Sequence, residues 1–272
     1  MKLDPRMTTV VTALMWSGAT VVDATLTPAA LAGWTSYVGV TERRVERELA
    51  ASDRFLGLDF GPDAAGKRRA LSGGAVVIEA VSAGDGQDGS IEVPSALLHH
   101  WRGAVLIPGA RLDELMSRLQ SGVAVGHPQD VLQSKVLERQ PDRLKVFLRL
   151  QRSKFVTVVY NTEHTVTFRR LGPTRASSTS TATKIAELEA PGTPQERELR
   201  PGHDRGFLWR WNSYWRYEQV PGGVIAECES ISLSRSVPSV VSFVAGPLIR
   251  STARESMERT LASLRTQFGQ RR

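Results

Sequence analysis

Residues 207–218 alternate between two kinds of side chain, and this pattern constrains the fold more than any other feature of the chain. One set of alternate positions holds five aromatic rings and one small residue: Phe207, Trp209, Trp211, Ser213, Trp215 and Tyr217. The other set is largely polar: Leu208, Arg210, Asn212, Tyr214, Arg216 and Glu218. Because successive side chains of a strand point to opposite faces, the pattern predicts a strand with one aromatic and one polar face.

A turn and a second strand follow the aromatic strand. The segment Val220-Pro221-Gly222-Gly223 is typical of a hairpin turn, and residues 224–235 return as a strand. Pairing through this turn puts Trp215 opposite Cys228, so a large ring faces a small partner. The same register predicts further pairs: Tyr217 with Ala226, Ser213 with Ser230, Trp211 with Ser232, Arg216 with Glu227, and Tyr214 with Glu229.

The rest of the chain predicts helices at both ends and strands between them. Residues 28–50 form a helix with an apolar stripe of Leu31, Trp34, Val38, Val45 and Leu49, and charged residues that include Arg44 face away. We expect strands over residues 75–83, 90–107, 131–139, 143–152, 155–171 and 176–188, and a helix over 111–121. Residues 238–249 form an apolar helix that breaks near Gly246-Pro247.

A capping box of Thr252 and Glu255 then begins the last helix, whose stripe is Ala253, Met257, Leu261, Leu264 and Phe268. A long amphipathic helix must bury such a stripe. The aromatic face of the preceding hairpin is the natural surface for it.

The N-terminal residues 1–24 have the pattern of an export signal. Lys2 and Arg6 precede an apolar segment that ends Val22-Asp23-Ala24, a small-x-Ala pattern of the kind that signal peptidases cut. We therefore expect an exported protein, periplasmic or secreted. The alternative is an N-terminal helix of a cytoplasmic protein.

Composition suits one domain, or one domain with an extension. The chain has 272 residues, of which 41% are hydrophobic, and a formal net charge of +7. Its basic residues are dispersed along the sequence, as on a solvated surface, so we expect no nucleic-acid partner. Contact with a membrane surface stays open. The single cysteine, Cys228, excludes an intramolecular disulfide.

Two motifs suggest cofactor chemistry and fail on inspection. Residues 61–68 nearly match the phosphate-binding pattern G-x-x-x-x-G-K-[ST], but Arg68 stands where a magnesium-binding hydroxyl is required, so a flexible loop is favoured. His99 and His100 are adjacent on a strand and point to opposite faces, so they do not bind one metal together. We expect neither a metal nor another cofactor.

Several segments together resemble the START/polyketide-cyclase (SRPBCC) superfamily. They are Val105-Leu106-Ile107-Pro108-Gly109 before a helix, Asp130-Val131-Leu132 before the strands, and the closing run of residues 212–235 with Arg254-Glu255-Ser256. The closing run is similar to that of exported bacterial members. The resemblance covers residues 90–268 and implies an α+β helix-grip fold, a curved antiparallel sheet wrapped around a long C-terminal helix. Residues 25–89 would be an N-terminal helix and hairpin extension, and residues 90–272 the START-like domain.

The favoured function is binding of a hydrophobic small molecule or lipid in a cavity between the sheet and the C-terminal helix, by a protein expected to be a monomer. The candidate ligand-binding residues are Tyr160, His164, Trp209, Trp211, Trp215 and Tyr217. The alternative is a cyclase or aromatase-type enzyme, for which His164 is the best general acid or base and Tyr160 a partner. Binding is favoured over catalysis because a buried core histidine is the commoner role, and no catalytic residue is assigned.

Overall fold

The computed structural model describes residues 25–83, 91–122, 130–153, 157–235 and 239–269, and side chains outside residues 239–253. The export signal predicted for residues 1–24 lies outside the described residues and stays a prediction. No helix among the described residues is both long and apolar enough to cross a membrane.

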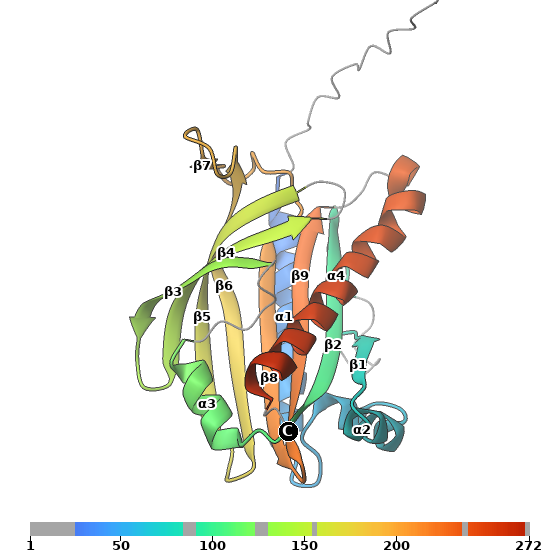
Figure 1. Cartoon of the computed structure of the whole chain (residues 1–272). Helices are drawn as coiled ribbons and strands as arrows, with labels where there is room; N and C mark the ends of the chain where they lie inside the picture. Colours follow the sequence, from blue (N-terminus) through green and yellow to red (C-terminus); the bar gives the residue numbers. More distant parts are fainter. Residues whose placement is uncertain (1–24, 84–90, 123–129, 154–156, 236–238, 270–272) are drawn as a thin grey trace, which may run out of the picture.

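One antiparallel sheet forms the body of the molecule (Figure 1). Its strands lie in the order β1-β2-β9-β8-β6-β5-β4-β3, and a short β7 pairs with β6. Their bounds are β1 Val76–Ala80, β2 Ala96–Pro108, β3 Val131–Arg139, β4 Arg143–Ser153, β5 Thr157–Arg170, β6 Arg175–Glu189, β7 Arg197–Glu198, β8 Arg210–Val220 and β9 Gly223–Arg235. Since β1 pairs with β2, the predicted N-terminal extension and the predicted START-like domain share this sheet.

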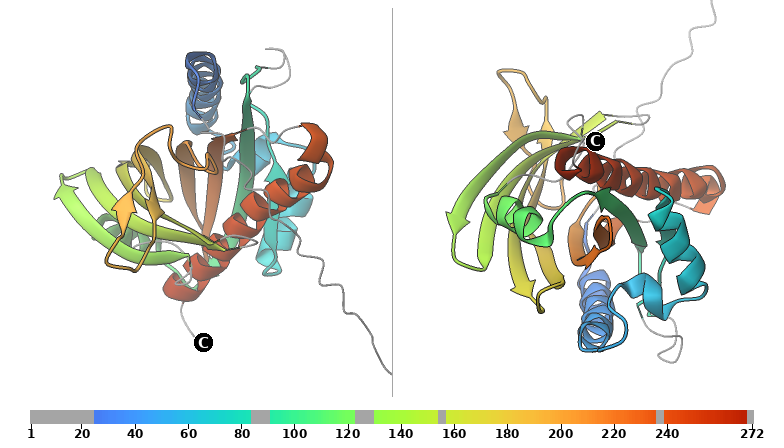
Figure 2. Two further views of the ribbon diagram at one scale, coloured as in Figure 1. Left: turned by 90° about the horizontal axis from the view of Figure 1, so that it is seen from above. Right: turned by 60° about the horizontal axis from the view of Figure 1, so that its bottom comes forward.

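Helices cover both faces of the sheet. The helices are α1 Pro28–Leu49, α2 Ala64–Ser72, α3 Leu112–Gln120 and α4 Ser239–Phe268, with a 3₁₀ turn at Gly57–Phe60. The long α4 crosses one face and α1 lies on the opposite face (Figure 2). We call these the α4 face and the α1 face. A curved antiparallel sheet around a long C-terminal helix is the helix-grip arrangement, so the predicted fold class is confirmed.

Apolar burial holds α4 against the sheet. Met257, Leu261, Leu264 and Phe268 of α4 belong to one core cluster with residues of β2 and β9, including Val105, Ile107, Ala226 and Cys228. Gly103 of β2 allows the helix to approach closely. A Cβ atom at this position would lie 2.7 Å from both Leu261 Cδ1 and Met257 Sδ.

The predicted hairpin register is confirmed in full. Val220 pairs with Gly223 around a turn of Pro221 and Gly222, and Trp215 lies opposite Cys228. Gly222 has φ of 89°, a conformation that favours glycine. The strand-face prediction is wrong for Trp209, because the regular alternation begins only at Arg210. Trp209 packs on the α1 face with Trp34 and Tyr37, away from the other tryptophans of the hairpin.

Three helix predictions need correction. Arg44 is buried in α1 instead of facing solvent, because acidic partners lie beneath it, whereas Leu31 is 39% exposed. The helix α4 continues through Pro247, so Thr252 and Glu255 lie within it and do not begin a new helix.

Residues 64–72 form the helix α2 rather than a flexible loop, with the side chain of Asp63 accepting from Gly66 N. Lys67 forms an ion pair with Glu79. Arg68 forms ion pairs with Asp59 and Glu218. The lysine of the near-match to a phosphate loop is therefore used within the protein.

Candidate ligand-binding site

His164 lies on the α4 face of β5, directly beside a β-bulge. The pairing of β5 with β6 shifts register between Glu163 and His164, which bends the strands locally. The ring is 3% exposed, and its Nε2 lies 3.0 Å from Thr162 Oγ1 while Nδ1 lies 3.3 Å from Ser180 Oγ. The Thr162 hydroxyl donates to the Leu148 carbonyl, so it accepts from the histidine, which assigns the imidazole proton to Nε2.

Burial lowers the pKa of His164 to about 4. The ring is therefore neutral near pH 7, with one nitrogen that donates and one that accepts. Its two hydroxyl partners satisfy both nitrogens without a carboxylate.

Trp211 links His164 to the hairpin. The two rings meet edge to face with centroids 5.0 Å apart, and Trp211 Nε1 donates to Ser230 Oγ across 3.0 Å. Ser230 of β9 is thus the hydrogen-bond partner of the Trp211 indole, which is itself only half-buried. The apolar part of the ring contributes to the cluster around Leu150 and Tyr160.

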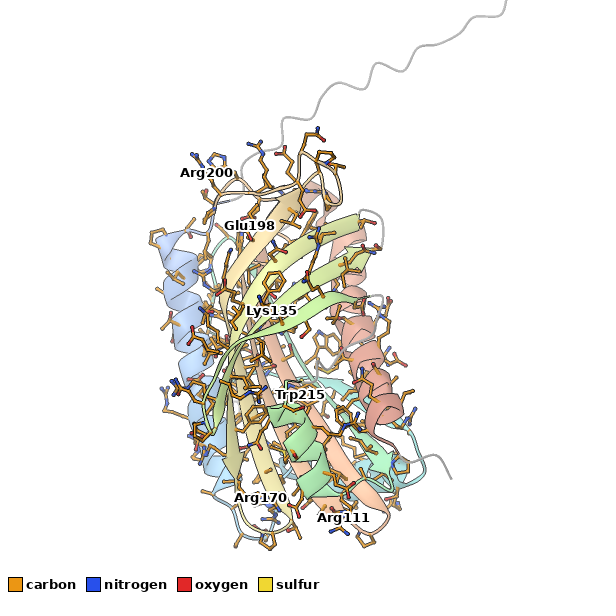
Figure 3. The ribbon with its side chains drawn as sticks, turned by 60° about the vertical axis from the view of Figure 1, so that its left-hand side comes forward. Arg111, Lys135, Arg170, Glu198, Arg200 and Trp215 are labelled. Carbon is orange, nitrogen blue, oxygen red and sulfur yellow. The ribbon has the colours of Figure 1, made fainter. Side chains whose placement is uncertain are left out.

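Trp215 and Tyr217 stack farther along the same face of β8. Their ring planes differ by 3° and their centroids lie 6.1 Å apart. Tyr217 is buried, with its hydroxyl 3.3 Å from Ser178 Oγ, whereas Trp215 is only half-buried. Figure 3 shows Trp215 beside α3, on the side of the sheet that α4 also covers.

Half-buried apolar side chains distinguish part of the α4 face from an ordinary core. Trp101, Val136, Val146, Val166 and Trp215 pack against the buried cluster but stay partly exposed. Sequence reasoning missed Trp101 and the three valines, because the ladder that brings β2, β3, β4 and β5 to one face joins residues far apart in the chain. Strand parity gives their face, but only the tertiary structure gives their exposure.

A pocket of about 300 Å³ lies between the β3–β4 edge of the sheet and α4. Its lining residues are Asp130, Leu132, Gln151, Ser153 and Arg259. None of the six predicted ligand-binding residues lines this pocket. Five of the six belong to the α4 face, and Tyr160, His164 and Trp211 lie together, whereas Trp209 belongs to the α1 face.

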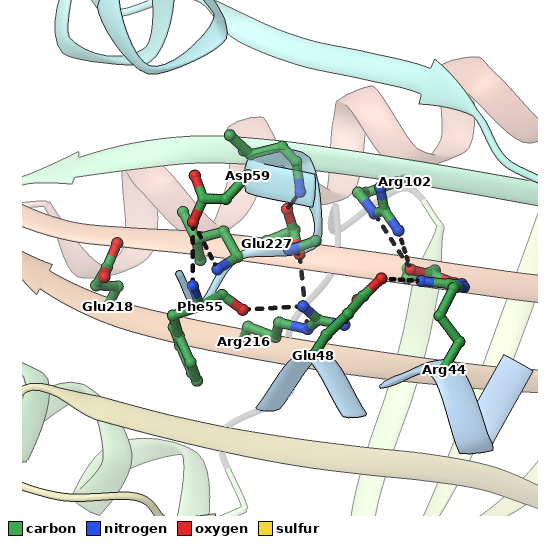
Figure 4. A network of polar contacts seen from close by, with 12 residues as sticks. Arg44, Glu48, Phe55, Asp59, Arg102, Arg216, Glu218 and Glu227 are labelled. Atoms are coloured by element: carbon green, nitrogen blue, oxygen red, sulfur yellow. Dashed lines mark hydrogen bonds and ion pairs between the residues drawn. The ribbon is translucent and has the colours of Figure 1, made fainter. Parts of the chain in front are cut away.

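The α1 face carries a buried network of ion pairs (Figure 4). Glu229 of β9 accepts hydrogen bonds from Arg44 of α1 and from Arg102 of β2. Burial by itself would raise the pKa of Glu229, but the His100 hydrogen bond and the arginine charges outweigh it and hold that pKa well below its usual range.

The neighbouring Glu227 differs in its environment. It accepts from the backbone N–H of Gly57 at 2.6 Å and of Leu58 at 2.9 Å, while Arg216 lies 3.8 Å away and also pairs with Glu48. Burial raises the pKa of Glu227 despite these partners and Arg102. Every described charge in this network has a partner inside the fold, and these ion pairs join α1 to the sheet. No described charge of the network is left to bind a ligand, so the α4 face is the candidate binding surface.

The basic surface offers no single patch among the labelled residues. Figure 3 places Arg200 at one end of the molecule, Arg111 and Arg170 at the other, and Lys135 between them. This dispersal agrees with the sequence, in which basic residues form only short clusters.

The described elements define the class as a helix-grip fold, with a curved antiparallel sheet around the long helix α4. The chain is similar to a STAR-related lipid transfer protein fragment from Xanthomonas axonopodis at 18% identity, covering 66% of this chain and 96% of that one with a TM-score of 0.44. It is similar to the human StarD13 lipid transfer and protein localization domain at 13% identity, covering 75% and 94%, with a TM-score of 0.42.

It is also similar to the Zhui aromatase/cyclase from Streptomyces at 10% identity, covering 63% and 93%, with a TM-score of 0.38. These likenesses concern the arrangement of the chain alone. No family model matches the sequence, and comparison with curated proteins found no match.

Proposed function

We propose that this protein binds a hydrophobic small molecule or lipid between α4 and the α4 face of the sheet. The observation that supports this proposal is the group of half-buried apolar side chains on that face, including Trp101, Trp211 and Trp215. Ligand sites are mostly apolar and contain a few placed polar groups. Here those groups are the hydroxyls of Ser178, Ser180 and Ser230, each within hydrogen-bond reach of a ring on this face.

The pocket beside α4 adds room at one end of this face. Its volume of about 300 Å³ lies at the lower end of the range for small-molecule sites. Its lining includes Leu132, which is 46% exposed. An apolar ligand that lies between the sheet and α4 would cover such side chains and remove their apolar surface from water, at about 25 cal/mol per Å².

Binding is favoured over cyclase chemistry by the environment of His164. With a pKa of about 4, its imidazole is a weak base. Near pH 7 the ring is neutral, so it is not an imidazolium ion that could donate a proton as a general acid. Both ring nitrogens already have hydroxyl partners. The histidine therefore fits a role as a neutral, positioned wall of the site.

A direct test is to purify the protein, extract it with organic solvent and identify retained molecules by mass spectrometry. A second arm titrates the stripped protein with the uncharged fluorescent probe N-phenyl-1-naphthylamine and follows intrinsic tryptophan emission. We expect a saturable, stoichiometric change. Absence of both retained apolar molecules and saturable probe binding by the folded protein would overturn the proposal.

A further inference from the structure

The pocket beside α4 has an ion pair in its wall. Asp130 precedes β3 and is 8% exposed, and its carboxylate accepts from Arg259 of α4, with Nε to Oδ2 at 2.9 Å and Nη2 to Oδ1 at 3.3 Å. Both residues line the pocket of about 300 Å³. This contact joins α4 to the β3–β4 edge of the sheet, at one end of the proposed binding face.

A second guanidinium lies next to the same carboxylate. Arg152 Nη1 is 3.7 Å from Asp130 Oδ1 and donates to the carbonyls of Asp130 at 3.4 Å and Gln151 at 2.9 Å. All hydrogen bonds of Arg152 to described residues thus come from one nitrogen. Two cations share one anion, so these three side chains have a net charge of +1.

The surroundings of Arg152 disfavour its charged form, so its pKa is lowered. Burial lowers its pKa, the nearby charge of Arg259 lowers it further, and Asp130 opposes both effects. A second anion beside the pair would relieve this repulsion. Guanidinium groups bind carboxylate and phosphate oxygens through paired N–H donors, which makes either acid a suitable partner.

Tyr160 connects this charged pocket to the aromatic face. Its ring belongs to one cluster with Leu150, Leu148 and Trp211. Burial raises the pKa of its hydroxyl, the charges of Glu187 and Asp204 raise it further, and those of Arg205 and Arg152 oppose them. That hydroxyl is buried and has no hydrogen-bond partner among the described residues, although buried hydroxyls normally have one. The same cluster includes Val131, which follows Asp130 in the chain, so apolar side chains extend from beside the Asp130–Arg259 pair to Trp211.

We propose that the ligand is an amphiphile with an acidic head group, which is bound by Arg259 in the pocket wall and by Arg152 beside Asp130, while its apolar chain lies along Tyr160 and Trp211. This inference rests on the proposed function and adds the chemical class of the ligand. Asp130 holds Arg259 in place when no ligand is bound and competes with the head group for it. A carboxylate and a phosphate monoester share the required chemistry.

The test compares head groups on one apolar chain. Palmitate, hexadecyl phosphate and hexadecanol are titrated as monomers against the stripped wild-type protein, and dissociation constants are measured by displacement of the fluorescent probe. A hydrogen bond to a charged group contributes about 1.5–3 kcal/mol, so we expect an acid to bind roughly 10- to 100-fold more tightly than the alcohol. The tighter of the two acids identifies the head group.

Variants assign the effect to these side chains. Arg259→Gln and Arg152→Gln should each remove most of the preference for the acid, measured as the ratio of the hexadecanol and acid dissociation constants of the same variant. Arg254→Gln is the matched control, because Arg254 is exposed on the same helix and neither lines the pocket nor pairs with Asp130. Asp130→Asn, which removes the competing carboxylate, should tighten acid binding.

A vesicle arm separates a bound monomer from a charged surface. Vesicles of phosphatidylcholine with phosphatidylglycerol are mixed with protein, and transfer of a fluorescent fatty acid out of the vesicles is followed. Equal affinity for palmitate, hexadecyl phosphate and hexadecanol would overturn the inference and leave the proposed function standing. If none of the three binds, the inference is overturned; the proposed function is overturned as well only if the protein also retains no apolar molecule and does not bind the probe.

Discussion

The imidazole of His100 lies 2.7 Å from the Glu229 carboxylate, and this contact joins β2 to β9 beneath α1. The Tyr37 hydroxyl of α1 lies 2.8 Å from the other ring nitrogen, Nδ1. Burial lowers the pKa of His100 although Glu229 opposes this, so the neutral ring donates from Nε2 and accepts from Tyr37. A chain of polar groups thus runs from Tyr37 of the helix through His100 to Glu229 of the sheet.

The first prediction concerns the charge of Glu229. Glu229→Gln keeps the side-chain shape but leaves Arg44 and Arg102 buried without their shared anion. Breaking a buried ion pair costs about 3–5 kcal/mol. Because Glu48 and Glu79 still pair with these arginines, we expect a loss at the lower end, about 3 kcal/mol in the free energy of unfolding, measured by urea denaturation. Glu46→Gln is the control, since its pair with Arg169 is exposed and contributes about 0–1 kcal/mol. Equal losses in the two variants would contradict this account.

The second prediction concerns His164 and pH. Its folded pKa of about 4 is lower than the ordinary histidine pKa of 6.5, so the fold favours the neutral ring. The associated stability is fully present above pH 6.5 and is lost as pH falls toward 4. We expect wild type to lose about 2 kcal/mol from this group by pH 5.

His164→Asn should have a flatter dependence of unfolding free energy on pH across that window. His100, whose pKa is also lowered, leaves a residual slope in both proteins. Identical slopes for variant and wild type would show that His164 does not titrate in this way.

The third prediction separates the two tryptophans that the sequence pattern treats alike. Trp211→Leu should weaken binding of the apolar probe several-fold, because the ring lies on the α4 face beside His164. Trp209→Leu should lower the free energy of unfolding but leave probe affinity unchanged, because Trp209 packs beneath α1. Probe titrations of the folded variants measure the affinities, and urea denaturation measures the free energies of unfolding. A larger loss of affinity in Trp209→Leu than in Trp211→Leu would indicate a site on the α1 face and contradict the proposed one on the α4 face.

The fourth prediction tests the close approach of α4 to β2. Gly103→Ala puts a Cβ atom 2.7 Å from Leu261 Cδ1 and Met257 Sδ, so one of them must move. Overpacking of this kind costs typically about 1–3 kcal/mol. Gly39→Ala in α1 is the control, because the nearest atom to the new Cβ is Arg43 Nη1 at 3.5 Å. It should stabilise the protein by about 0.5–1 kcal/mol, and thermal unfolding distinguishes the two signs.

Much of the fold could be predicted because strand patterns and turn chemistry act over short distances. The hairpin of β8 and β9, its register and the order of the later strands all follow from local alternation. The break predicted at Pro247 was wrong, since proline disfavours a helix interior locally but α4 continues past it.

The candidate site was predictable only in part. Tyr160, His164 and Trp211 share a face because each has the right parity on its strand, and the structure brings them together. Trp101 and Arg259 could not be selected in advance, because their positions depend on how β2 and α4 meet strands that are distant in the sequence.

The sequence by itself determined which side chains share a strand face, because the two-residue period of a strand is a property of the local backbone. Only the tertiary structure decided what covers each face. Arg44 carries the charge of a surface residue but is buried, since Glu229 and Glu48 lie within reach once α1 is packed on the sheet. Trp209 lies on the α1 face instead of with the other aromatic residues of the hairpin. Its burial against Trp34 and Tyr37 depends on contacts between segments that are distant in the sequence, and a local pattern does not contain them.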